Sequence, residues 1–139
     1  MAITVTRFDH TLVLVGNQSI DYTNLKVMLT SGYTLDTSET TMTNVSAAEV
    51  SGNGWTAGGE LIANAAWTQV NTNDGRLDGD DISVTASGGS IGPADAHVVY
   101  DATNNLPLLH VDFGETKEAG DTTQFKVSFA STGLIEMTA

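Results

Sequence analysis

The chain of 139 residues contains no cysteine. This absence excludes disulfide bridges, thiolate nucleophiles and cysteine-ligated zinc. The length is that of one domain, and we expect residues 1–139 to form a single β-rich domain. A domain of this size buries enough surface to fold without a covalent or metal cross-link.

Basic residues are scarce. Five Lys and Arg stand against 17 Asp and Glu, which gives a net charge of −12. A chain this acidic is repelled by nucleic-acid phosphates and by anionic lipid, so we expect neither nucleic acid nor membrane as a partner. Solubility at high concentration or in salt is the plain interpretation of the acidity.

Long hydrophobic runs are also missing. The longest is "LVLV" at 12–15, far too short to cross a bilayer. The N-terminal "MAITVTRFDH" lacks a basic region followed by an apolar stretch, the pattern of a secretory signal. We therefore expect a protein that is made in a cytoplasm and acts elsewhere after assembly.

Several segments alternate apolar and polar residues with a period of two, which is typical of strands with one buried face. Turn signals separate them, among them "NTNDGR" around Asp74–Gly75, "SGGSIGP", "DATNNLP" and "GETKEAGD". The pattern predicts a mainly β fold, an antiparallel β-sandwich or a barrel-like domain. The segments "LLHVDF", "QFKVSF" and "LIEMT" are expected to form its core sheet. The inward-facing residues would include Leu25, Val27, Leu29, Ile82, Val84, Leu109, Val111, Phe113, Phe125, Val127 and Phe129.

One short helix is predicted near the N-terminus, in "FDHTLVLVGNQ". Phe8, Leu12 and Val15 follow helical spacing, and Asp9 is placed to cap the first turn. The same "TLVLV" run would also suit a buried strand.

The segment "AEVSGNGWTAGG" (48–59) is the least ordinary part of the chain. It matches neither the dinucleotide-binding fingerprint nor a phosphate-binding P-loop, because no βαβ pattern surrounds it and no P-loop lysine follows. Glycines allow a backbone to approach another surface closely, and a tryptophan fills a pocket. We interpret the segment as a structural clamp whose pocket lies in the chain's own sheet or in a neighbouring subunit. Its key residues are Gly52, Gly54, Trp55, Gly58 and Gly59.

No group of residues predicts catalysis. "GGSIG" matches the nucleophile-elbow pattern around Ser90 but lacks the helix that must follow. His97 and His110 lie on predicted strands without a matching carboxylate motif, so no metal or other cofactor is expected. The run "NDGRLDGDD" departs from the EF-hand pattern, although a loose calcium site there stays open. Its acidic residues are Asp74, Asp78, Asp80 and Asp81, and the strand carboxylates that form no general acid–base pair are Asp95, Asp101 and Asp112.

The order of segments resembles a family of small structural proteins of tailed-bacteriophage virions. The resemblance lies in "KVML", "SGYT", "AEVSGNGWTAGG", "VVY" and "LLHVDFG", and it spans about residues 24–138. Trp55 stands where the family has a tyrosine. The N-terminal segment departs most from the pattern, because "HTLVLVGNQ" is a poor copy of the amphipathic helix common in the family.

The resemblance implies a non-enzymatic virion protein, most concretely a capsid decoration or cement protein. Such a protein would bind the major capsid protein on the outer surface of the shell as a homotrimer. A tail or head-fibre component is the alternative within the virion. A carbohydrate-binding β-sandwich, with Trp55 or Trp67 stacking on a sugar, is the alternative outside it.

Overall fold

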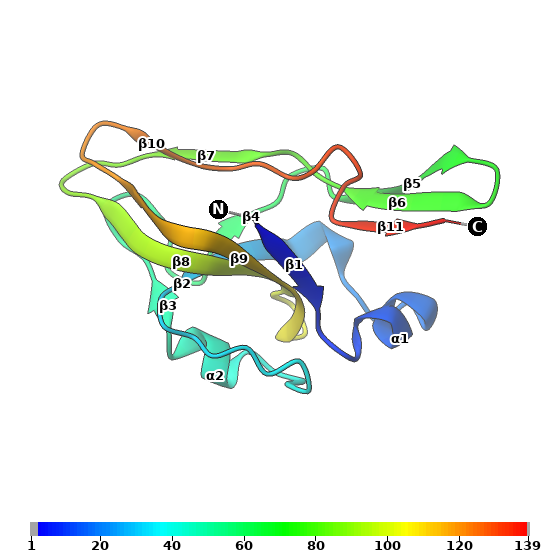
Figure 1. The fold of residues 1–139 in the computed structure, drawn as a ribbon. Helices are drawn as coiled ribbons and strands as arrows, with labels where there is room; N and C mark the ends of the chain where they lie inside the picture. Colours follow the sequence, from blue (N-terminus) through cyan, green and yellow to red (C-terminus); the bar gives the residue numbers. More distant parts are fainter. Residues whose placement is uncertain (1–2, 139) are drawn as a thin grey trace.

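A computed structural model of the chain describes residues 3–138, which form two layers of antiparallel strands, with two short helices that lie apart from each other below the main sheet in the view of Figure 1. The mainly β, sandwich-like prediction is confirmed. In chain order the elements are β1 (Thr4–Arg7), α1 (Thr11–Gly16), a 3-10 turn (Tyr22–Asn24), β2 (Leu25–Thr30), α2 (Thr43–Ser46), β3 (Glu49–Val50), β4 (Glu60–Leu61), β5 (Ala66–Asn71), β6 (Asp74–Asp78), β7 (Ile82–Thr85), β8 (Ile91–Asp101), β9 (Leu106–Ala119), β10 (Gln124–Val127) and β11 (Ile135–Met137).

The main sheet has the strand order β1-β9-β8-β2-β3, and β4 also pairs with β2. Two smaller sheets form the second layer, one of β10 and β7 and one of β11, β6 and β5. The segments "LLHVDF", "QFKVSF" and "LIEMT" therefore belong to three different sheets, and the prediction that they form one core sheet was wrong. Alternation records which side chains are buried, but it does not record which strand pairs with which.

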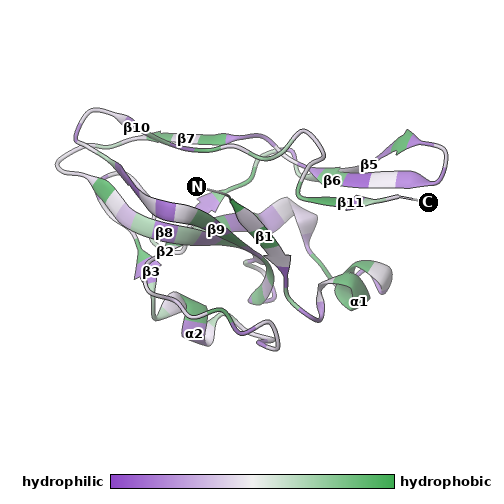
Figure 2. Ribbon diagram, in the orientation of Figure 1, coloured by the Kyte–Doolittle hydropathy of each residue, from purple (hydrophilic) through white to green (hydrophobic). Residues whose placement is uncertain are grey.

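The centre of the main sheet is buried on both faces. One face packs against the second layer in a large apolar cluster that includes Val27, Val99 and Phe125. The other face packs against the 31–48 segment in a smaller cluster that includes Met28 and Val98. The expected one-sided burial holds for β10, where apolar and polar residues alternate between buried and exposed. It fails for β2, where Met28 and Thr30 are buried as well. Figure 2 shows green and purple bands mixed along β8 and β9.

The N-terminal helix exists, but its cap and its buried side differ from the prediction. His10, not Asp9, precedes the first turn, and it makes no side-chain cap. Leu12 is exposed. Thr11 is buried instead, and its hydroxyl donates to the Leu108 carbonyl oxygen at 2.8 Å. The side of α1 that faces the protein is therefore set by this hydrogen bond to β9 and not by its apolar residues. A second helix, α2, was not predicted.

Two predicted turns also lie elsewhere. The β5–β6 hairpin turns at Thr72–Asn73, because Asn71 pairs with Asp74 and Asn73 has a φ of +64°. Asp74–Gly75 is already strand. Most of "GETKEAGD" continues β9, which pairs with the start of β8 as far as Ala119.

Candidate functional site

The glycine-rich segment interrupts the edge of the main sheet. Thr30 and Leu29 of β2 pair with β3, and Val27 and Lys26 pair with β4, so residues 51–59 form an excursion between two short pieces of one edge. Broken edge strands of this kind resist pairing with other chains. The segment is therefore part of the edge of the sheet.

The excursion begins with a tight turn. The backbone N–H of Gly52 donates to the Trp55 carbonyl oxygen at 2.9 Å, and the N–H of Trp55 donates to the Gly52 carbonyl oxygen at 3.1 Å. Asn53 and Gly54 between them both have positive φ, 56° and 113°. A two-residue turn of this type favours Asn-Gly, so the "NG" pair carried a hairpin signal that the sequence analysis missed.

Two of the loop glycines, Gly54 and Gly59, lie where other backbone comes close. A Cβ on Gly54 would lie 2.8 Å from the Thr85 carbonyl oxygen, and one on Gly59 would collide with the Val27 carbonyl oxygen. Asn53 fastens the turn by donating its side-chain N–H to the Ser90 carbonyl oxygen at 2.7 Å. The turn is thus held against both β2 and the β7–β8 connection.

Gly58 is held from two sides. Its N–H donates to Glu49 Oε2 at 2.5 Å, and its carbonyl oxygen accepts from the Tyr100 hydroxyl. Burial raises the pKa of Tyr100, and the Glu49 carboxylate adds to the effect. The hydroxyl therefore stays a donor at neutral pH.

Trp55 is 2% exposed and packs edge-to-face on Phe125, with ring centroids 5.5 Å apart. Its pocket lies in its own chain, so of the two sites left open for the clamp, the internal one holds the side chain. A buried ring cannot stack on a sugar, which removes Trp55 from the carbohydrate-binding alternative. Trp67 is only half-buried and meets Tyr22 edge-to-face at 6.4 Å.

The loop offers little to an anion. The N–H groups of Gly52, Trp55, Thr56, Gly58 and Gly59 all donate to acceptors of the protein itself. Anion sites at turns depend on such N–H groups being free. The segment shapes the fold and makes no phosphate cradle.

The other candidate residues are not brought together. Ser90 precedes a strand, not a helix, and so lacks the context of a nucleophile elbow. Asp80 accepts from Asn64 and Asp81 from the backbone N–H of Phe129, at 2.6 and 2.9 Å, so these two carboxylates serve separate contacts. Within residues 3–138, no group of three or more His, Cys, Asp and Glu side chains could hold a metal ion.

Asp101 has a structural role that the sequence did not indicate. It is fully buried, and its carboxylate accepts from the Asp21 N–H at 2.9 Å and from the Asn104 side chain at 2.8 Å. It also accepts from the Thr103 N–H at 2.9 Å. These bonds fix the β8–β9 turn beside the start of β2.

The two strand histidines lie on opposite faces of the main sheet. His110 pairs with Val98, whereas its neighbour Val111 pairs with His97. The His110 ring centroid lies 5.8 Å from that of Tyr33, with the two planes tilted by 53°, and His97 meets Phe113 edge-to-face with centroids 5.5 Å apart. Neither ring nitrogen of His97 has a hydrogen-bond partner among the described residues. Burial lowers the pKa of His97 to about 3, with a smaller contribution from His110. Burial also lowers the pKa of His110 itself.

Comparison of the chain with protein-family models, with curated proteins and with solved structures gives no match. No helix within residues 3–138 is both long and apolar enough to cross a bilayer.

Gly59→Ala and Gly52→Ala separate the steric role of the loop from its backbone conformation. The two glycines have nearly the same φ, 101° and 104°, but only a Cβ at position 59 meets backbone, because position 52 opens on free space. We expect Gly52→Ala to cost about 1 kcal/mol from the positive φ alone. Gly59→Ala should cost about 2 kcal/mol more, since β2 or the loop must shift. Urea unfolding measures both, and equal losses would contradict the clamp.

The stability of the fold should fall as the pH falls below 6.5. His97 is neutral when folded because its pKa is lowered to about 3, whereas the unfolded chain takes up a proton near pH 6.5. The contribution of neutral His97 to the free energy of unfolding is present above pH 6.5 and is lost on acidification, by about 1.5 kcal/mol between pH 6.5 and 5. Urea unfolding across this range should show a smaller pH slope for His97→Gln than for the wild-type chain. An unchanged slope in His97→Gln would refute this origin.

Proposed function

We propose that this chain is a non-enzymatic structural protein of a tailed-phage particle, a decoration or cement protein that binds the outer surface of the major capsid shell. The proposal rests first on the family resemblance, which spans about residues 24–138. Attachment as a homotrimer belongs to the same proposal. The glycine loop supports a structural role, because its hydrogen bonds and its tryptophan are used within the chain.

The observation that carries the docking part of the proposal is where apolar side chains are exposed. Four of the seven exposed large hydrophobic side chains in residues 3–138 lie between positions 3 and 13. They are Ile3, Val5, Leu12 and Val13. Ile3 and Val5 lie just before and within β1, and Leu12 and Val13 lie in α1. These two elements follow one another at one side of the molecule, and α1 is largely apolar (Figures 1 and 2). Exposed apolar side chains that lie together mark interaction surfaces, and the adjacent Leu12 and Val13 of α1 are such a pair.

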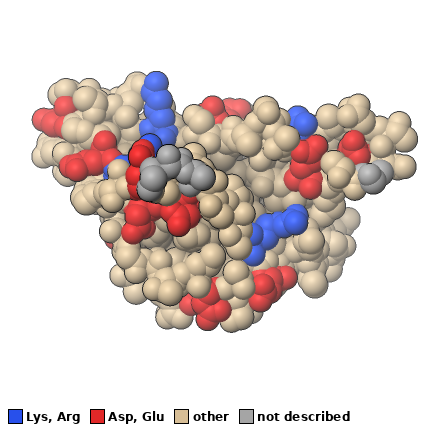
Figure 3. Space-filling view, viewed as in Figure 1, with Lys and Arg blue, Asp and Glu red and all other residues tan. Residues whose placement is uncertain are grey.

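The charge distribution fits an outward position. Figure 3 shows acidic side chains in separate groups over the visible face, with few basic ones between them. A protein with a net charge of −12 is repelled from packaged DNA and is favoured on the outside of a shell.

Attachment through this surface should withstand sodium chloride. Salt screens contacts between exposed charges but does not weaken apolar burial. We therefore expect the protein to stay on purified particles in 1 M sodium chloride. At this concentration the Debye length is only about 3 Å, so attraction between exposed charges is largely screened. Sedimentation of the particles followed by quantification of bound protein measures this. Release by moderate sodium chloride alone would contradict an apolar attachment.

The variant Leu12→Asp/Val13→Asp tests the surface itself. We expect at least a tenfold loss of particle binding, because truncated interface anchors typically cost about 2 kcal/mol or more. Leu61→Asp is the control, since Leu61 is exposed on β4, which pairs with β2 at the opposite edge of the main sheet from β1. Wild-type binding by the double variant would exclude the α1 surface. Binding confined to the tail would replace the shell by the tail as the site.

A further inference from the structure

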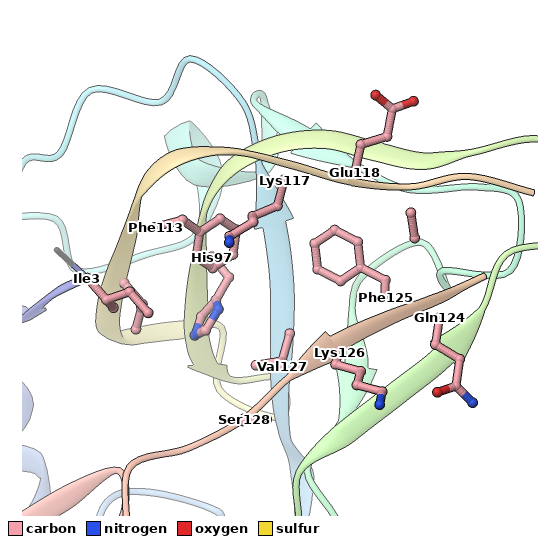
Figure 4. A pocket seen from close by; sticks show the side chains of 12 residues that line it. Ile3, His97, Phe113, Lys117, Glu118, Gln124, Phe125, Lys126, Val127 and Ser128 are labelled. Atoms are coloured by element: carbon pink, nitrogen blue, oxygen red, sulfur yellow. The ribbon is translucent and has the colours of Figure 1, made fainter. Parts of the chain in front are cut away.

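A cavity lies between the main sheet and the segment that contains β10 and residues 128–134. It has two lobes, of about 320 Å³ and about 380 Å³, which share Ile3, His97, Val111 and Ser128 in their walls. Phe113 and Phe125 line the first lobe, and Phe129 lines the second. These are three of the four phenylalanines of the chain. Figure 4 shows the first lobe with His97 between Ile3, Phe113 and Val127.

His97 is the buried polar group at the junction of the lobes. Its side chain is 3% exposed, and both ring nitrogens are unpartnered within residues 3–138. A buried polar group without a hydrogen bond is costly, so a partner that enters the cavity and bonds to the imidazole gains free energy. The neutral ring provides one N–H donor and one acceptor nitrogen.

The rim carries no preference for an anion. Lys117 is paired with Glu115, and Glu118 lines the same lobe as Lys126. The charges at the opening therefore balance, in a chain whose net charge of −12 repels anions. Burying a carboxylate among phenylalanines would add a large desolvation cost.

We propose that this cavity binds a small neutral molecule with an apolar, ring-sized body and one hydroxyl group, a phenol or an alcohol. The body packs among the phenylalanines, and the hydroxyl hydrogen-bonds to His97. The volume of each lobe lies in the range of small-molecule sites, and rigid apolar cavities in proteins accept molecules such as benzene. The proposal does not depend on the virion role: the cavity shares Ile3 and Val5 with the exposed apolar residues of the N-terminal segment, but it uses neither Leu12 nor Val13 of α1.

The test uses the full chain and two probes that differ by one hydroxyl, p-cresol and toluene. Titrations followed by NMR of the His97 ring nitrogens should show saturable binding of p-cresol with a shift of these resonances. The affinity for p-cresol should exceed that for toluene by about tenfold, the value of one satisfied buried hydrogen bond. No saturable p-cresol binding would overturn the proposal, as would equal affinities or shifts confined to other residues.

His97→Phe should abolish the preference for p-cresol over toluene. His110→Phe is the matched control, because it makes the same change on the adjacent strand but on the opposite face of the sheet. It should keep the tenfold preference. A preference that survives in His97→Phe would place the hydroxyl elsewhere and refute the role of His97. If His97→Phe does not fold, the wild-type nitrogen shifts decide the question alone.

Discussion

The structure depends on one constraint: β2 and β8 carry buried apolar side chains on both faces, so the main sheet needs a cover on each side. The 31–48 segment with α2 covers one face, where Met42 and Val45 are fully buried. The strands of the second layer cover the other; they are β5, β6, β7, β10 and β11. The chain must therefore pass from one face to the other around an edge of the sheet, and the glycine-rich segment does this beside β2.

That crossing explains why the loop has its composition. Glycine is required at position 59 because the backbone passes against Val27, and Asn-Gly is required at 53–54 because both residues have positive φ. Trp55 then fills the space under Phe125. The glycine-rich segment, whose composition is typical of a binding loop, makes its contacts within its own chain. The interaction surface has to be sought elsewhere, and the exposed residues of β1 and α1 are the strongest candidates.

The sequence patterns predicted which side chains are buried better than they predicted which strands pair. Alternation identified Phe125 and Val127 as inward-facing, and both are buried. It could not assign β9, β10 and β11 to their sheets, because pairing depends on contacts distant in the chain. His97 was noted as a strand histidine, but its cavity forms only when β10 and the segment after it pack over β8 and β9. The buried side of α1 was likewise decided by β9 through Thr11.

The acidic surface and the exposed apolar residues of the N-terminal elements are both used in the proposed function, in which the protein would attach by apolar contact and present its charge to solvent. The most direct measurement is a cryo-electron microscopy reconstruction of the tailed-phage particle to which we propose that this chain belongs. The account predicts density for this fold on the outside of the capsid shell, with α1 and β1 against the major capsid protein. Density for the fold only on the tail, or inside the shell against DNA, would contradict it.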